Sequence, residues 1–169
     1  MKPMAALGSD WKLAFDAFPS AQHEVEDAMW CYAVGRHNAC VFQLMRAVEH
    51  GMRALAAERG IKLPADRPLE YGTWENVIKA INNALKDPSG IIKWTPGKAK
   101  EAALSFYSGA VTDMSAMRDM YRNAVSHARS DYKRFDADSA IFRVRELLTR
   151  LSTKIREGNT IQLQQSDWP

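Results

Sequence analysis

The sequence is poor in cysteine, with Cys31 and Cys40 as its two examples in 169 residues. Cysteines nine positions apart fit neither a zinc knuckle nor a redox motif, and no second pair is present. Both lie within stretches that have the apolar spacing of helices. We therefore expect two reduced, inert core thiols and no cysteine-based catalysis.

Long apolar runs are also absent. No stretch approaches the ~20 residues that cross a bilayer as a helix, and residues 1–8 are too short and too interrupted for a signal peptide. These features predict a cytoplasmic protein without a membrane partner. We find no strand-like alternation, internal repeat or linker either, which leaves a helical fold as the expectation.

Charge of one sign does not dominate the chain, since 23 Lys and Arg stand against 20 Asp and Glu and give a formal net charge of +3. This balance permits a polyanionic partner but does not require one. The length fits one domain with a core of its own. We divide it into a short N-terminal helix and lead-in (1–20), a helical domain (21–157) and a mobile tail (158–169).

Apolar side chains repeat at helical spacing along most of the chain, which predicts an all-α, up-and-down bundle of about four to five main helices. Glycines after the first two of these, Gly35 and Gly60, indicate where they end. The segment from Asp131 to Asp136 is expected to be a connection. After a short helix over 11–18, the main helices are expected to start near Ala21, Arg36, Thr73, Thr95 and either Asp138 or Ser139.

Basic, amide and imidazole groups are crowded between Arg118 and Arg129, where the fourth main helix is expected to end. Arg122 and His127 form an Arg-x4-His arrangement. On a continuous helix these two lie ~140° apart, whereas Asn123 and His127 share a face. They can converge on one substrate if the helix breaks between them, or if a second copy of the chain brings its own pair.

A continuous helix would also align basic and hydroxyl groups into one stripe. Such a stripe is a reasonable footprint for a phosphate backbone, and equally the pattern of a solvated helix face. Spacing alone does not separate the two. The stripe consists of Arg118, Arg122, Ser126, Arg129 and Lys133.

The run from Arg122 to His127, late in a helical bundle and preceded by a long helix containing residues 39–51, resembles the HEPN superfamily (higher eukaryotes and prokaryotes nucleotide-binding domains). The resemblance spans roughly residues 21–155. Arg122, Asn123 and His127 match the family's Arg-polar-x3-His signature position by position.

The resemblance implies a metal-independent endoribonuclease without a cofactor, assembled at the interface of a homodimer, with RNA or a nucleotide as its ligand. Arg122 would clamp the phosphate, His127 would move protons, and Asn123 would orient His127 or the substrate. The 2′-hydroxyl of the RNA would be the nucleophile, so products would carry 2′,3′-cyclic phosphate ends. A toxin or phage-defence setting is also implied by the resemblance alone.

The sequence departs from one subgroup of the family. Toxins of that subgroup, which pair with nucleotidyltransferase antitoxins, have tyrosine two positions after the histidine, where this chain has Arg129. The resemblance therefore implies a protein antitoxin as a partner, while Arg129 does not match the class that pairs with nucleotidyltransferase antitoxins. Because many members of the superfamily are inactive, a non-catalytic nucleotide- or RNA-binding module or a dimerisation module is the alternative.

Other chemistries have less support. No histidine has an acid three residues before it, so a di-metal bundle is not expected and we predict no metal site. Glu49, with Arg46 and Arg53 at helical spacing, is interpreted as an ion-pair cluster rather than a catalytic acid. Large apolar side chains are interpreted as packing anchors or, for the methionines, as core or dimer-interface filler: Trp11, Trp30, Trp74, Trp94, Met114, Met117 and Met120.

Overall fold

The computed structural model describes residues 9–86, 94–122 and 131–169, and every regular element within these ranges is helical. The predicted all-α class is therefore confirmed. No helix in the described ranges is long and apolar enough to cross a membrane. These ranges contain six α-helices: α2 (Lys12–Ala17), α3 (Pro19–Ala33), α4 (His37–Glu58), α5 (Trp74–Lys86), α6 (Lys98–Met117) and α8 (Arg134–Ser152).

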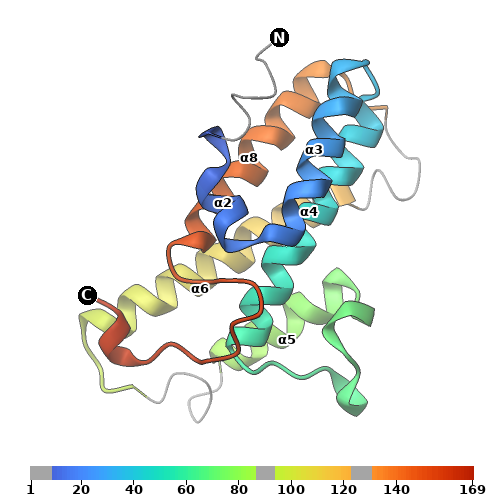
Figure 1. The fold of residues 1–169 in the computed structure, drawn as a ribbon. Coiled ribbons are helices and arrows are strands. Elements are labelled where there is room, and N and C mark those ends of the chain that lie inside the picture. Colours follow the sequence, from blue (N-terminus) through green and yellow to red (C-terminus); the bar gives the residue numbers. More distant parts are fainter. Residues whose placement is uncertain (1–8, 87–93, 123–130) are drawn as a thin grey trace.

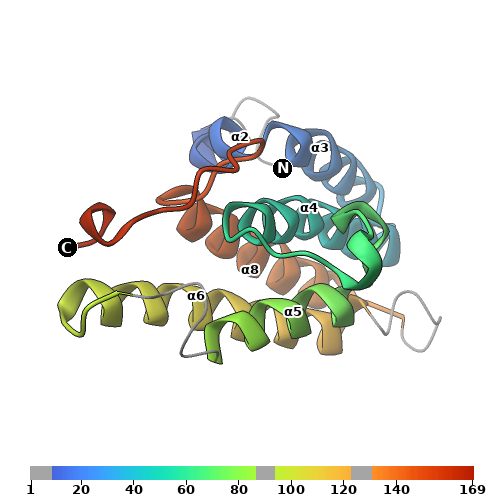
Figure 2. The ribbon, with the colours of Figure 1, turned by 90° about the horizontal axis from the view of Figure 1, so that it is seen from below.

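Short turns complete the regular structure: the 3-10 turns η1 (Pro64–Asp66), η2 (Leu69–Tyr71) and η4 (Gln165–Asp167), and the π-helical turn η3 (Arg118–Arg122). Helix α4 is central and contacts α3, α8, α5 and α6 (Figure 1). Seen from below, α2 and α3 form one layer, α4 and α8 the next, and α5 and α6 a third (Figure 2).

Glycines end α3 and α4 as the sequence predicts. Gly35 and Gly60 have positive φ angles of 75° and 63°. Beyond α4, the Gly60 N–H donates to the Ala57 carbonyl and the Ile61 N–H to the Ala56 carbonyl, both at 2.9 Å. This is the Schellman arrangement, which satisfies carbonyls that the helix leaves without a partner.

The core follows the predicted apolar stripes closely. On α4, all six residues expected to face inward are buried, and so are all six predicted along α6 and η3. Gly51 permits the close approach of α4 to α8, because a β-carbon at this position would lie 2.7 Å from the Leu148 side chain. The α4 residues are Val41, Leu44, Met45, Val48, Met52 and Leu55, and the others are Ala103, Tyr107, Ala110, Met114, Met117 and Tyr121.

Two predicted helix starts are wrong. Helix α8 begins at Arg134 and not at Asp138 or Ser139, because the Asp136 carboxylate accepts a hydrogen bond from the Lys133 N–H at 2.8 Å and closes a first turn there. Helix α6 begins at Lys98, after Gly97. The hydroxyl of Thr95, the expected cap, instead lies 3.0 Å from Gln165 Oε1 in the tail.

The short N-terminal helix contributes to the same core as the longer helices. Trp11 and Phe18 are both at most 2% exposed, and α2 contacts α3 and α8. Pro19 separates α2 from α3 and occupies the first position of α3, where its missing N–H leaves no helical hydrogen bond unmade.

The tail expected to be mobile makes specific contacts with the domain. The Leu163 N–H donates to Glu58 Oε1 at 2.7 Å, and the Leu163 carbonyl accepts from Arg59 at 3.0 Å. Trp168 is 8% exposed, and its ring lies 5.8 Å from the ring of Tyr107. Residues 158–169 therefore cover the end of α4 and part of α6.

Beneath the tail lies a fully buried ion pair. Glu58 and Arg59 are neighbours in sequence, and both side chains are 1% exposed. The Arg59 Nε donates to Glu58 Oε2 at 2.8 Å, and the Tyr107 hydroxyl donates to the same oxygen at 3.0 Å. Burial raises the pKa of Tyr107, with the negative charge of Glu58 adding to the effect.

Of the tryptophans and cysteines that the sequence predicts to be core residues, some are buried and others are not. Trp11 and Trp74 are buried, but the prediction for Trp30 is wrong, since its side chain on α3 is 59% exposed. Cys40 is buried, and this burial raises the pKa of its thiol to about 12, which keeps it protonated and inert. Cys31 is half-buried.

Candidate functional site

The regular α-helical hydrogen bonding of α6 ends at Met117, and the next five residues form the π-helical turn η3. A π turn has a wider backbone than an α-helix and is often found at functional sites. The chain therefore stays helical through Arg122 with a changed hydrogen-bond pattern, and the predicted end of the helix near the basic segment falls at or beyond the last described residue of this range, where it stays a prediction. Asn123, Ser126, His127 and Arg129 are outside the described residues, so their arrangement around Arg122 stays a prediction.

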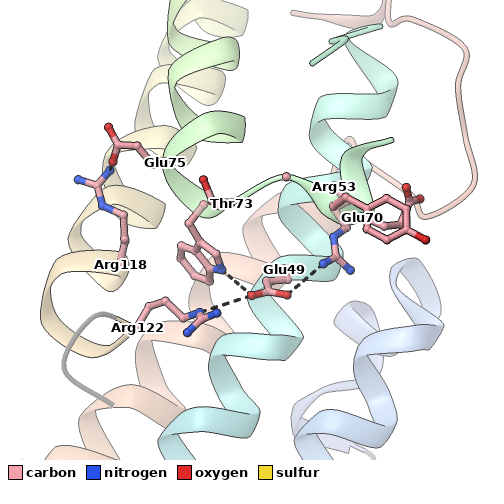
Figure 3. A pocket seen from close by; sticks show the side chains of 10 residues that line it. Glu49, Arg53, Glu70, Thr73, Glu75, Arg118 and Arg122 are labelled. Carbon is pink, nitrogen blue, oxygen red and sulfur yellow. Dashed lines mark hydrogen bonds and ion pairs between the residues drawn. The ribbon is translucent and has the colours of Figure 1, made fainter. Parts of the chain in front are cut away.

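Arg122 faces an open cavity of about 540 Å³ between η3, α4 and the segment that leads into α5. Three arginines and three glutamates line this cavity, together with aromatic side chains. Figure 3 shows Glu49 between Arg122 on one side and Arg53 on the other. The lining residues are Glu49, Arg53, Glu70, Tyr71, Gly72, Thr73, Trp74, Glu75, Arg118 and Arg122.

Glu49 connects the walls of the cavity. Its Oε1 accepts a hydrogen bond from the indole N–H of Trp74 at 2.7 Å and lies 3.6 Å from Nε of Arg122. Its Oε2 accepts from Arg53 at 3.1 Å. With 18% of its side chain exposed, Glu49 is a partly buried anion that holds groups from α4, α5 and η3 together.

The predicted ion-pair cluster around Glu49 is confirmed for Arg53, whereas Arg46 interacts with the charge of Glu49 without a direct contact. Arg46 instead makes two hydrogen bonds of 2.8 Å to Glu24 on α3. These bonds hold the pKa of Glu24 below its usual range, although burial of the carboxyl acts in the opposite direction. This pair fastens α3 to α4 and does not line the cavity.

The described members of the predicted basic stripe lie at two different hollows of the surface. Arg118 lines the same cavity as Arg122, but it pairs with Glu75 and, at 2.9 Å, with Asp119. Lys133 precedes α8 and lines a different hollow, together with Asn38 and Tyr132. Arg118 and Arg122 are therefore the two stripe residues that meet at this cavity among those described.

The charges in the cavity limit what it can do alone. Each of its three arginines has a carboxylate within 4 Å, so the described residues of one chain do not form an uncompensated cationic pocket. The 3.6 Å contact of Arg122 is the longest of these pairs, and its side chain is 33% exposed. A phosphate in the cavity can reach such a partly exposed guanidinium while Glu49 remains beside it.

Comparison of the chain with protein-family models, with curated proteins and with solved structures gave no match in any of the three. The likeness of residues 122–127 to the HEPN signature therefore depends on those residues alone. Within the described ranges, no three His, Cys, Asp or Glu side chains gather in a way that could hold a metal ion.

Sequence reasoning missed Trp74 as a site residue, because its position at the apolar face of α5 predicts only packing. It is indeed 5% exposed, but its indole N–H needs a hydrogen-bond acceptor when buried. The Glu49–Arg53 spacing was visible in the sequence. The contacts of the Glu49 carboxylate with Trp74 and Arg122 join three separate elements, and no local sequence pattern indicates them.

Proposed function

We propose that the protein is a metal-independent endoribonuclease of HEPN type, which cleaves RNA at a cleft between two copies of the chain. The observation that carries the proposal is the Arg122 guanidinium at the wall of an open cavity, beside the partly buried Glu49. Arg122 also begins the run that resembles the HEPN signature. A toxin or phage-defence role belongs to the same proposal.

In this proposal, the RNA supplies its own nucleophile. The 2′-hydroxyl oxygen attacks the adjacent phosphorus as a base removes its proton, the bond from phosphorus to the 5′-oxygen breaks, and an acid protonates that oxygen. The products are a 2′,3′-cyclic phosphate and a 5′-hydroxyl. His127 moves the protons, Asn123 orients it or the substrate, and Arg122 stabilises the charge that develops on the phosphate.

A homodimer is part of the proposal for two reasons. Each chain has one histidine in the run, whereas the reaction needs both a base and an acid, so a two-fold dimer would bring two histidines and two arginines to one cleft. In addition, the arginines of one cavity are balanced by its own glutamates. A second copy would bring the same balanced cavity, so the positive charge that an RNA backbone needs would come from the basic residues of both copies other than the cavity's three arginines, among them Arg129 and Lys133.

Glu49 would act as a positioning residue. Its carboxylate lies 3.6 Å from Nε of Arg122, and the Trp74 indole N–H donates to the same oxygen at 2.7 Å. An arginine held in this way loses less conformational freedom when it binds a phosphate. The remaining members of the basic stripe would bind phosphates further along the RNA: Arg118, Ser126, Arg129 and Lys133.

The alternative function is a non-catalytic RNA- or nucleotide-binding or dimerisation module. The ion pairs of Arg118 with Glu75 and Asp119 favour it. An arginine that is held by two carboxylates contributes to the structure and is less available to stabilise a reacting phosphate. The two functions differ in one measurable respect, which is whether RNA is cut.

The decisive experiment is incubation of labelled single-stranded RNA with the purified protein in EDTA. Arg122→Ala and His127→Ala are assayed beside two matched controls, Arg156→Ala and His23→Ala, which change exposed residues outside the cavity. We expect cleavage by the wild type and both controls, cyclic phosphate ends, and a loss of at least a hundredfold in the two site variants.

Folding and dimerisation of each variant are checked by circular dichroism and analytical ultracentrifugation. No cleavage of several RNAs by a well-folded dimer would move the assignment to the binding module. Cleavage that survives both site substitutions would reject the assigned residues.

A further inference from the structure

Tyr71 is an exposed aromatic residue at the cavity that contains Arg122. It ends η2, lines the cavity, and is 68% exposed. Other large apolar side chains are also exposed, including those of Trp30 and Phe135, but they do not line this cavity. Tyr71 therefore combines an accessible ring with a place at the same cavity as Arg122.

The backbone that carries this ring is held in place. The Tyr71 N–H donates to the Pro68 carbonyl at 3.1 Å, and the Gly72 N–H donates to the Leu69 carbonyl at 3.0 Å. Gly72 packs so closely that a β-carbon there would lie 2.6 Å from the Leu63 side chain. The ring is thus presented from a fixed turn, which reduces the entropy lost when a flat ligand stacks on it.

The two ends of the cavity differ in chemistry. Arg118 and Glu75 lie toward one side of Glu49, and Arg53 and Glu70 toward the other (Figure 3). Tyr71 directly follows Glu70, whose exposed carboxylate would repel a phosphate. This end is therefore better suited to a nucleobase, which is uncharged and has a flat face, than to a second phosphate.

The size of the cavity is compatible with such a ligand, because about 540 Å³ lies within the range of small-molecule sites. Sequence-specific or not, proteins bind single-stranded RNA by stacking its bases on aromatic side chains while cations follow the backbone. Arg122 and Tyr71 offer these two functions at one cavity.

We propose that Tyr71 forms a nucleobase-stacking subsite, which holds a base of single-stranded RNA next to the phosphate contacted by Arg122. The proposal rests on the proposed function, because it assigns the phosphate to Arg122. It adds a determinant of substrate class: the ligand is an unpaired strand, since the faces of bases in a duplex are covered by their neighbours.

The test measures binding of two short fluorescent oligonucleotides, so that it does not depend on cleavage. One is 2′-O-methyl RNA, which lacks the nucleophile, and the other has the same length of sugar-phosphate backbone without bases. Dissociation constants are measured in EDTA for the wild type, Tyr71→Ala, Tyr71→Phe and Arg122→Ala, with Trp30→Ala as the matched change of an exposed aromatic outside the cavity.

We expect Tyr71→Ala to weaken binding of the base-containing strand by about 5- to 150-fold, the range for loss of one stacked base. Binding of the backbone without bases should not change. Tyr71→Phe and Trp30→Ala should bind both strands as the wild type does, and Arg122→Ala should weaken both.

Equal weakening of both strands by Tyr71→Ala would overturn the stacking subsite, and so would unchanged binding of the base-containing strand. In either case, weaker binding by Arg122→Ala together with RNA cleavage by the wild type would leave the proposed function intact. If the wild type neither binds nor cuts RNA, the subsite and the proposed function are both rejected.

Discussion

Two glutamates on α4 form arginine pairs with opposite surroundings. Glu49 and Glu58 are nine positions apart, which places them ~180° apart around the helix. Glu58 and its partner Arg59 are each 1% exposed. The Glu58 carboxylate also accepts hydrogen bonds from the Tyr107 hydroxyl and the Leu163 N–H. Glu49 is 18% exposed at an open cavity, and its contact with Arg122 is 3.6 Å long.

The difference shows what surroundings do to the same pair of charges. A buried carboxylate that is bonded on both oxygens has no capacity left for a ligand, and the loss of one partner leaves an uncompensated charge in the core. A carboxylate at a cavity leaves its arginine partly exposed, so an anion in the cavity can reach the guanidinium while the carboxylate still holds it. We therefore interpret the Glu58 pair as structural and the Glu49 pair as available for binding.

The largest expected effect is that of Glu58→Gln. The substitution keeps the shape of the side chain but leaves the buried Arg59 without its counter-ion. We expect the free energy of unfolding to fall by about 3–5 kcal/mol, measured by urea denaturation. Glu146→Gln is the control, since its carboxylate is 58% exposed and should change stability by less than about 0.5 kcal/mol. Equal losses in the two variants would contradict the structural interpretation.

Trp168→Ala tests whether the C-terminal tail, which covers the buried Glu58–Arg59 pair, stabilises the domain. Its ring lies 5.8 Å from Tyr107 and 5.4 Å from Phe106, and removing a buried tryptophan side chain leaves a cavity. The expected loss is about 3 kcal/mol in urea denaturation. The exposed Trp30→Ala should stay within about 0.5 kcal/mol of the wild type. A similarly small effect at residue 168 would mean that the tail does not stabilise the domain.

A third pair, Glu24 with Arg46, lies between these extremes. Because the pKa of Glu24 is lowered in the folded state, its contribution is present above the pKa of the unfolded chain and is lost as pH falls through the folded value. We expect the wild type to be more stable than Glu24→Gln by about 1 kcal/mol at neutral pH.

The measurement is urea denaturation of both proteins across the acid range. The difference in stability should shrink as pH falls below the ordinary carboxyl range, about pH 4. A difference that does not change with pH would assign the effect to packing and not to the charge of Glu24.

Glu49→Gln should have the smallest effect on stability, at most about 1 kcal/mol, because the pair is partly solvated. The same substitution should lower the rate of RNA cleavage by roughly tenfold to a hundredfold, because Arg122 would lose its fixed position. Cleavage rates and urea denaturation are compared in the same preparation. Unaltered cleavage would remove Glu49 from the proposed site, and a stability loss equal to that of Glu58→Gln would remove the contrast between the two pairs.

The sequence predicted the interior better than the surroundings of charged groups. Periodic apolar residues such as Leu44 and Met114 are buried as expected, because a helix has one repeat and its buried face can be counted. The start of α8 was misplaced because Asp136 stabilises the first turn from its third position, by accepting from the Lys133 N–H, whereas the sequence pattern favoured Asp138 or Ser139 as the cap. The tail was expected to be mobile since its polar composition does not reveal the contacts of Leu163 or Trp168.

The candidate site was predictable only in its local part. The spacing of Glu49 and Arg53 indicates an ion pair within one helix. The approach of Arg122 and Trp74 to the same carboxylate depends on how α5 and α6 pack on α4. The spacing of residues along the sequence does not report this packing. Tyr71 is a single aromatic residue in a turn, and its neighbours in space became visible only in the folded chain.

The contact between Glu58 and Leu163 joins residues 105 positions apart. During synthesis, helix α4 leaves the ribosome long before the segment that completes the hydrogen bonding of its last carboxylate. The nascent chain therefore has to keep Glu58 and Arg59 hydrated until residue 163 emerges, and only then can this end of the core exclude water. Final burial of the pair is a late event in the biogenesis of the protein, and a chain that stops before residue 163 would retain an unfinished core.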